Sequence, residues 1–284
     1  MQARLEKGIE AIQEARKQGL KHVSLTDPDA RMMGEGRTRR ITECHSYEVA
    51  MDNGVLVVGQ PTQNGNDNDR LLPLVEAAQK TLAGVEPAVP VTEVDGDSGY
   101  FSSEAVAALE QQGLHTCIPD AWTAADLHHG NPIGTARQTR QGTVSFEYDA
   151  QADHYTCPQG NILRYNSASK HHGQQVRVYK AKNSCAECPL AKACLQQKTA
   201  NYRTLKVGVD SGLLQKLRER FQDTAHQDRY NQRGPAVETV FGFLRGTLGY
   251  TRWQLRTTPK VACEAVLWNL AYQFRKVHFA WRQA

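Results

Sequence analysis

The sequence predicts an α/β fold with a mixed sheet flanked by helices, interrupted by a small cysteine-rich module. Apolar residues at helical spacing predict helices, for example over residues 71–82. Strand-like and helix-like segments alternate as far as residue 120, which is typical of an α/β layer. Residues 121–210 are polar and contain glycine and cysteine. We therefore expect three segments, 1–120, 121–210 and 211–284.

The first segment begins with an expected helix over residues 1–18, because apolar residues recur at helical spacing before a glycine stop: Leu5, Ile9, Ile12, Ala15 and then Gly19. A short strand is expected at residues 22–26, followed by a Gly/Arg-rich loop. Two further strands, 43–51 and 55–59, should form a hairpin across Asn53-Gly54, a pair that accepts positive φ. After helix 71–82, a strand should end near Asp97. A helix that Gly113 ends and a strand over 114–118 complete this segment.

In the last segment, the helical spacing of apolar residues predicts helices at 213–221, 236–244 and 259–277. Pro235 and Pro259 suit the first turns of the last two, where a missing N–H costs nothing. Helix 236–244 should bury Val237, Val240, Phe241 and Leu244. Glu238 and Arg245, seven residues apart, should then lie along a neighbouring edge two turns apart.

The formal charge is only +4, but basic residues concentrate between residues 159 and 208. Glu187 is the one acid there, against nine bases: Arg164, Lys170, Arg177, Lys180, Lys182, Lys192, Lys198, Arg203 and Lys206. This excess suits a phosphate backbone, and a solvated lysine-rich loop is the alternative. The sequence has no apolar run of about 18 residues and no secretory signal, so we expect a cytoplasmic protein without membrane contact.

Four of the seven cysteines are grouped: Cys157, Cys185, Cys188 and Cys194. In a cytosolic chain this pattern indicates metal more than disulfides. The four thiolates fit a tetrahedral zinc site, an iron–sulfur cluster suits the same spacing, and a metal-free group is the third reading. The other three cysteines are expected to be buried and without a functional role: Cys44, Cys117 and Cys263. The pairs His128-His129 and His171-His172 are expected in solvated loops.

Two acids stand out by position. Asp97 follows an expected strand, where a carboxylate can face a cleft, although an Asp before Ser-Gly is also typical of a turn. Glu238 lies beside an apolar helix face, where it is either functional or a surface partner of Arg245.

The surrounding residues resemble a known family. The run Tyr230-Asn231-Gln232-Arg233, followed by Glu238 and Arg245, resembles the Tyr-x-x-Arg…Glu…Lys/Arg signature of DDE-type bacterial insertion-sequence transposases. Further runs resemble the subfamily with a cysteine-rich insert and occur in its order: residues 26–31, 50–52, 97–101, 155–160 and 185–190. The resemblance covers nearly the whole chain.

The resemblance implies a ribonuclease-H-like catalytic domain, with residues 1–120 as its first part, 121–210 as a basic cysteine-rich insertion and 211–284 as a helical part carrying the last acid. Three acids, Asp97 and Glu238 among them, would hold two magnesium or manganese ions for in-line displacement at phosphorus. The partner would be double-stranded DNA, as transposon ends and target, bound by a homodimer at the bacterial nucleoid. The expected phosphate-binding residues are Tyr230, Arg233, Arg245, Arg164, Lys170, Arg177, Lys180 and Lys182.

One part of the family pattern is missing. The first acid of the family sits on a strand of the type Leu-Asp-Gly-Thr, which this sequence does not contain. Our interpretation is that the chain begins after that strand, so that it would show little strand transfer alone. The alternative assigns the first acid to Asp27. A non-catalytic zinc-ribbon DNA-binding protein and a stand-alone nuclease are the other functions considered.

Overall fold

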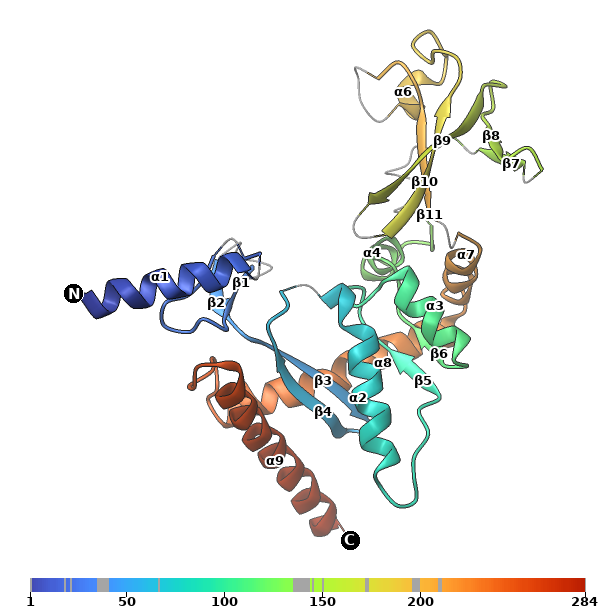
Figure 1. Cartoon of the computed structure of the whole chain (residues 1–284). Coiled ribbons are helices and arrows are strands. Elements are labelled where there is room, and N and C mark those ends of the chain that lie inside the picture. Colours follow the sequence, from blue (N-terminus) through green and yellow to red (C-terminus); the bar gives the residue numbers. More distant parts are fainter. Residues whose placement is uncertain are drawn as a thin grey trace. The chain divides into compact units, whose positions relative to one another are not determined.

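The computed structural model describes residues 2–17, 19–20, 22–34, 41–65, 67–134, 144, 146–149, 151–171, 174–195, 200–208 and 211–283. Helices and strands are mixed, as the sequence predicted (Figure 1). The chain forms two compact units. Unit 1 contains Met1–Val94 and Asn231–Ala284, and unit 2 contains Asp95–Tyr230. The expected segment boundaries near residues 120 and 210 both fall inside unit 2.

Unit 1 starts with helix α1 (Gln2–Lys17), and Gly19 has the positive φ of 68° expected of a helix stop. The strand expected at residues 22–26 is absent, which corrects that prediction. Side chains there bind the local backbone instead, because the Asp27 N–H donates to Ser24 Oγ at 3.3 Å. The first strand is β1 (Arg31–Gly34), which pairs antiparallel with β2 (Ile41–Cys44).

The predicted hairpin is confirmed. Strands β3 (Ser46–Asp52) and β4 (Val55–Thr62) pair antiparallel across Asn53 and Gly54, whose φ angles are 46° and 76°. These left-handed values explain the Asn-Gly sequence, because such turns match the twist of the strands. Helix α2 (Leu71–Ala83) is also confirmed and contacts both strands. Just before it, Arg70 binds both carboxylate oxygens of the buried Glu48, at 2.8 and 3.0 Å.

The C-terminal part of unit 1 supplies its apolar core. Helix α8 (Thr224–Gly242) continues into a π-helical segment η2 (Phe243–Thr247), and helix α9 (Thr258–Gln283) follows. The core combines these elements with β4: Leu56, Val240, Phe243, Leu244, Trp268 and Tyr272.

The predicted start of the penultimate helix was wrong. Pro235 lies inside α8, because polar residues extend the helix back to Thr224 without an apolar stripe to reveal it. Phe243, which the prediction did not include, is buried, whereas Phe241 is only half-buried. The helix expected at 259–277 is confirmed as α9, with Pro259 in its first turn.

Unit 2 contains α3 (Ser103–Gln111), β6 (His115–Cys117), α4 (Ala121–His129) and α7 (Ser211–Arg220), with β6 hydrogen-bonded to the short strand β5 (Glu93–Asp95). Ser102 caps α3, and Gly113 ends it with a φ of 81°. His128 and His129 form the last turn of α4 instead of the loop expected there, because Asp120 caps that helix.

Two ion pairs fix α7 within unit 2. Arg218 binds the buried Asp120, and Arg220 binds Glu110 through both guanidinium nitrogens at 2.7 and 2.8 Å. Burial raises the pKa of Glu110, but hydrogen bonds from Arg220 and Thr116 outweigh it and lower the pKa to about 2. Glu110 is therefore ionised at neutral pH and holds α3, β6 and α7 together.

The cysteine-bearing part of unit 2 is a five-stranded antiparallel sheet in the order β11-β10-β9-β8-β7. The strands are β7 (Glu147–Asp149), β8 (His154–Thr156), β9 (Ile162–His171), β10 (Gln174–Ala181) and β11 (Thr204–Gly208), and the short helix α6 (Ala191–Cys194) precedes β11. Asp153, with a φ of 48°, accepts hydrogen bonds from Tyr148 and Tyr179 at 2.8 and 2.7 Å. These bonds stabilise the sheet at the turn between β7 and β8.

Candidate active site and nucleic-acid interface

Asp97 lies two residues beyond β5, in the loop that leads to α3. Its side chain is exposed, and Oδ1 accepts the Gly99 N–H at 2.7 Å, which fixes the direction of the carboxylate. The backbone before it is tightly packed, since a Cβ built on Gly96 would lie 3.3 Å from Ile118. Asp97 is therefore exposed on a loop whose preceding residue, Gly96, packs closely against Ile118.

A neighbouring ion pair was missed by the sequence reasoning. Asp95, the last residue of β5, accepts a hydrogen bond at 2.8 Å from Nε of Arg229 on α8. Arg229 also reaches the His115 carbonyl oxygen at 3.4 Å. The next residue, Tyr230, packs edge-on against Phe221 with ring centroids 5.8 Å apart. The signal was Arg229 beside the Tyr-x-x-Arg run, but only the fold shows which acid it meets.

Glu238 lies on α8 and its side chain is exposed. A Cβ built on Gly234 would be 4.0 Å from Glu238 Oε1, so a small residue one turn earlier leaves this carboxylate open. Arg245 lies in the π-helical turn, where the regular seven-residue spacing of an α-helix changes, so its alignment with Glu238 stays a prediction. The Arg245 guanidinium lies 5.9 Å from the Phe241 ring centroid. Arg233 is half-buried.

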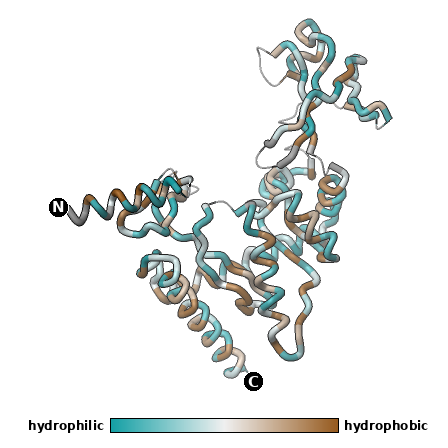
Figure 2. The backbone as a smooth tube through the Cα atoms, in the orientation of Figure 1, coloured by the Kyte–Doolittle hydropathy of each residue, from teal (hydrophilic) through white to brown (hydrophobic). Residues whose placement is uncertain are grey.

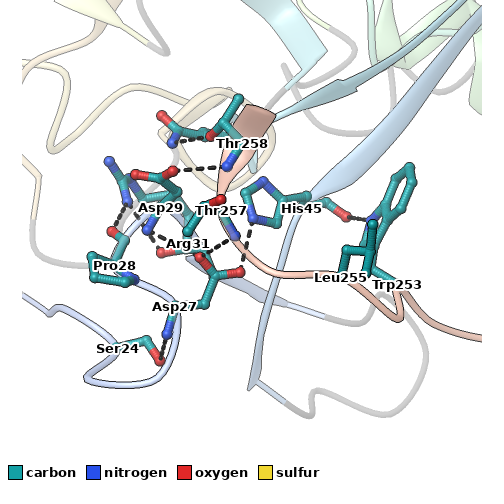
Figure 3. A network of polar contacts seen from close by, with 12 residues as sticks. Ser24, Asp27, Pro28, Asp29, Arg31, His45, Trp253, Leu255, Thr257 and Thr258 are labelled. Atoms are coloured by element: carbon teal, nitrogen blue, oxygen red, sulfur yellow. Dashed lines mark hydrogen bonds and ion pairs between the residues drawn. The ribbon is translucent and has the colours of Figure 1, made fainter. Parts of the chain in front are cut away.

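Asp27, the alternative first acid, belongs to a polar network at the start of α9 (Figure 3). Its Oδ2 lies 3.1 Å from His45 Nε2, and its Oδ1 accepts the N–H groups of Thr257 at 3.0 Å and Asp29 at 3.3 Å. Asp29 in turn accepts the Thr258 N–H at 2.7 Å. Asp27 is 9% exposed. Both of its oxygens are occupied, which favours a structural role.

The basic residues expected to bind DNA are partly aligned on the five-stranded sheet. Arg164 on β9 is the cross-strand neighbour of both His154 on β8 and Lys180 on β10. Arg164 and Lys180 are exposed. Like charges directly opposite one another destabilise a sheet unless an anion offsets them. We call these three residues the basic row (His154, Arg164 and Lys180); within it, Arg164 and Lys180 are the directly opposed cations that an anion would offset.

The other predicted DNA contacts differ in their surroundings. Arg177 forms an ion pair with Asp153, and its guanidinium lies 4.9 Å from the Tyr165 ring centroid, so it is already engaged within the sheet. Lys182 is exposed directly after β10. The side chain of Lys170, like those of the pair His171-His172, lies outside the described residues.

All four grouped cysteines line one pocket of about 260 Å³ beside the sheet. Asn161 donates its backbone N–H to Cys157 Sγ at 3.3 Å and its side-chain N–H to Cys185 Sγ at 3.6 Å. Burial raises the pKa of the Cys194 thiol, and the other three cysteines raise it further although Arg203 lowers it. The sequence therefore located four thiols that the fold brings together.

The three other cysteines differ in their exposure. Cys117 is buried as expected and Cys44 is half-buried, but Cys263 is exposed on α9, which corrects its assignment. Among the residues that the structure describes, no three His, Cys, Asp or Glu side chains are close enough together to hold a metal ion. No helix of this part of the chain is long and apolar enough to span a membrane.

Comparison with known proteins bears on the same residues. Residues 156–278 match a family model described as Transposase DDE domain. The matched range contains Glu238, Tyr230, Arg233, Arg245 and the four grouped cysteines, whereas Asp27 and Asp97 precede it. A search of curated proteins and a search of solved structures gave no match. The match supports a DDE-type transposase catalytic domain and a function in DNA transposition.

The Asp27 network makes a prediction about stability. Asp27→Ala should lower the free energy of unfolding by about 2 kcal/mol or more, because His45 and the Thr257 N–H lose a charged acceptor in a buried setting. Urea unfolding followed by circular dichroism measures this. Glu76→Ala, which removes an exposed acid from α2, is the control and should change stability by less than about 0.5 kcal/mol. An equally small effect of Asp27→Ala would contradict the structural role.

Proposed function

We propose that this protein is the catalytic domain of a DNA transposase, with a ribonuclease-H-like fold, which cleaves phosphodiester bonds and transfers DNA strands during transposition. The observation that carries the proposal is the match of residues 156–278 to the Transposase DDE domain. The mixed α/β architecture is compatible with such a domain. Asp97, in the loop after β5, and Glu238, in the last turns of α8, both have exposed side chains.

Asp97 and Glu238 are the proposed metal ligands. Asp97 keeps Oδ2 without a hydrogen bond to any described residue, and Glu238 forms no ion pair with the described part of the chain. Carboxylate oxygens of this kind are the hard ligands that magnesium and manganese prefer. By contrast, the buried acids Asp27, Glu48 and Asp120 are all committed to internal donors. The donor chemistry therefore fits divalent ions at Asp97 and Glu238.

When bound, the ions would activate the attacking oxygen and stabilise the departing one in an in-line displacement at phosphorus. The contribution of the chain is to hold the DNA. Arg233 and Arg245 can grip two phosphate oxygens each through the guanidinium fork, and Tyr230 can donate its hydroxyl. Arg229 binds Asp95 and so fixes the part of α8 that carries Tyr230.

Divalent-ion binding tests the two acids independently of turnover. Asp97→Asn and Glu238→Gln should each weaken Mn²⁺ binding at least about tenfold, because each removes a charged ligand. Isothermal titration calorimetry of the purified chain measures the affinity. With transposon-end DNA and magnesium, the same variants should lose strand cleavage and joining wherever the unmodified chain shows them.

Two matched variants serve as controls. Glu104→Gln removes an exposed acid from the first turn of α3, and Asp228→Asn removes one from α8. Both should bind Mn²⁺ like the unmodified chain. If Asp97→Asn and Glu238→Gln also bind it unchanged while DNA binding persists, the non-catalytic DNA-binding alternative is favoured. Hydrolysis without joining of DNA ends would indicate a nuclease.

The basic row is the proposed contact with the DNA backbone. Arg164→Glu and Lys180→Glu should each weaken binding of duplex DNA several-fold at 100 mM salt, and each should reduce the slope of log K against log[salt] by about 1, because one phosphate contact is lost. Fluorescence anisotropy at several salt concentrations measures both. Lys80→Glu, on α2, makes the same charge change at an exposed site and should leave the slope unchanged.

The cysteine-lined pocket is proposed to hold zinc, with an iron–sulfur cluster as the alternative. Four thiols line one pocket, and Asn161 donates N–H groups to two of the sulfurs, Cys157 Sγ and Cys185 Sγ. The sulfurs are not within ligand distance of a common point, so binding requires the segments around Cys185 to Cys194 to close. Metal would then fix the sheet that carries the basic row.

Metal analysis tests this site. The purified chain should contain about one zinc per chain, Cys188→Ser should contain much less, and Cys263→Ser should match the unmodified chain because Cys263 is distant in sequence and exposed on α9. Iron with acid-labile sulfide and visible absorbance would identify a cluster instead. Equal metal in the unmodified chain and in Cys188→Ser would refute the pocket as a metal site.

A further inference from the structure

Helix α9 has two opposite apolar faces. One face packs into the core of unit 1 through Val261, Ala265, Trp268 and Tyr272. The other, which we call the α9 stripe, consists of Cys263, Leu267, Leu270, Phe274, Val277 and Trp281. By the 3.6-residue period of the helix, the stripe lies about half a turn away from the buried face. Figure 2 shows hydrophobic residues alternating with hydrophilic ones along α9.

The side chains of the stripe are exposed to an unusual degree. Leu267 is 64% exposed, Phe274 70%, Val277 66% and Trp281 75%. Beyond Tyr272 no residue of α9 is buried, and residues 274–275 and 277–283 are all exposed. Single exposed apolar residues are ordinary, but a continuous row of this kind marks an interaction surface.

The spacing of the stripe identifies the kind of partner. Its residues are separated by four, three, four, three and four positions, so that every second residue of the stripe recurs after seven positions, as the a and d positions of a heptad do. A row with this period faces a second helix throughout its length, with side chains packing as knobs into holes. A DNA backbone or an acidic partner would require positive charge along the row. The basic residues of this part of α9, Arg275, Lys276 and Arg282, lie off the stripe.

The charge pattern favours a second copy of the same helix. From residue 266 to 280, all positions that flank the stripe are occupied by residues without a fixed charge: Val266, Ala271, Gln273, His278 and Ala280. Two copies can therefore approach without like-charge repulsion. The stripe offers on the order of 500 Å² of apolar surface per copy, since aromatic side chains alone bury about 150–250 Å² each. With the flanking residues, the buried surface comes near the roughly 800 Å² per partner of stable interfaces.

We propose that α9 forms an antiparallel pair with α9 of a second copy of this chain. In the register that places stripe residues opposite one another, Leu270 faces Phe274 of the second copy, Leu267 faces Val277, and Cys263 faces Trp281. Each of the last two layers then combines a larger with a smaller side chain, as close packing requires. The antiparallel arrangement also opposes the two helix dipoles favourably.

The antiparallel arrangement supports the exposed end of the helix. Unit 1 holds α9 as far as about Lys276, since Gln273 donates to the Leu56 carbonyl oxygen at 2.7 Å and the Arg275 guanidinium lies 5.1 Å from the Phe243 ring centroid, whereas residues 277–283 are all exposed. Antiparallel pairing lays these exposed last turns of each copy against the supported first half of the other. The proposal rests on α9 alone and stands independently of the DNA chemistry, and its test contains neither DNA nor divalent ions.

Sedimentation equilibrium of the purified full chain measures the self-association. The unmodified chain should dimerise, and the double variant Leu270→Glu/Phe274→Glu should weaken the dimer at least about 100-fold, because four apolar side chains per dimer are replaced by charged ones. Phe279→Glu is the matched control. Phe279 is apolar and 48% exposed on the same helix but lies off the stripe, so this variant should dimerise like the unmodified chain.

A disulfide test reports the orientation. Trp281→Cys should form an intermolecular disulfide between Cys263 and the introduced thiol under mild oxidation, and peptide mass spectrometry should locate it. A disulfide between the two Cys263 residues would indicate a parallel pair and overturn the antiparallel register. A monomer at all concentrations, or a dimer unaffected by Leu270→Glu/Phe274→Glu, would overturn the proposal itself. A monomer with Cys263 protected from alkylation would show that the stripe is covered within one chain.

Discussion

Unit 1 depends on hydrogen bonds between the beginning and the end of the chain. It is built from two stretches, Met1–Val94 and Asn231–Ala284, that are far apart in sequence. Asp27 and Asp29 accept the N–H groups of Thr257 and Thr258, where α9 begins. These N–H groups have no partner within the helix, and two buried or half-buried carboxylates satisfy them and complement the positive end of its dipole. The two stretches are thereby joined at a defined position.

This constraint separates acids that hold the fold from acids that are exposed to solvent. The carboxylate of Asp27 is enclosed, and a metal ion there would have to displace His45 or the backbone of Thr257. Asp97 and Glu238 lie at the surface, each on an element whose position is set by neighbouring packing. Further along α9, Asn269 bonds to the Gly59 carbonyl at 2.7 Å, where a Cβ on Gly59 would overlap the Asn269 amide. The same helix therefore carries both the join of unit 1 and, on its opposite face, the α9 stripe.

Sequence patterns predicted elements wherever local chemistry decides the conformation. The Asn53-Gly54 turn and the α2 stripe depend on neighbours within a few residues, so the hairpin and helix followed from the sequence. The predictions of helices and strands failed where the local sequence pattern gave no signal or a misleading one. The polar first half of α8 has no apolar stripe, and the strand expected at residues 22–26 gave way to side-chain bonds with the local backbone. The cysteine spacing indicated a group of four, and the fold does place all four around one pocket.

By itself, the sequence determined the mixed α/β class, the hairpin, most of the helices and the motif residues that match the transposase family model. These properties reside in residue types and short spacings. Tertiary structure alone decided that Asp27 is enclosed, that Arg229 binds Asp95, that Arg164 and Lys180 are neighbours, and that Cys263 faces solvent. Each of these depends on contacts between residues distant in the chain, or on which helix face the core covers, and no local pattern carries that information.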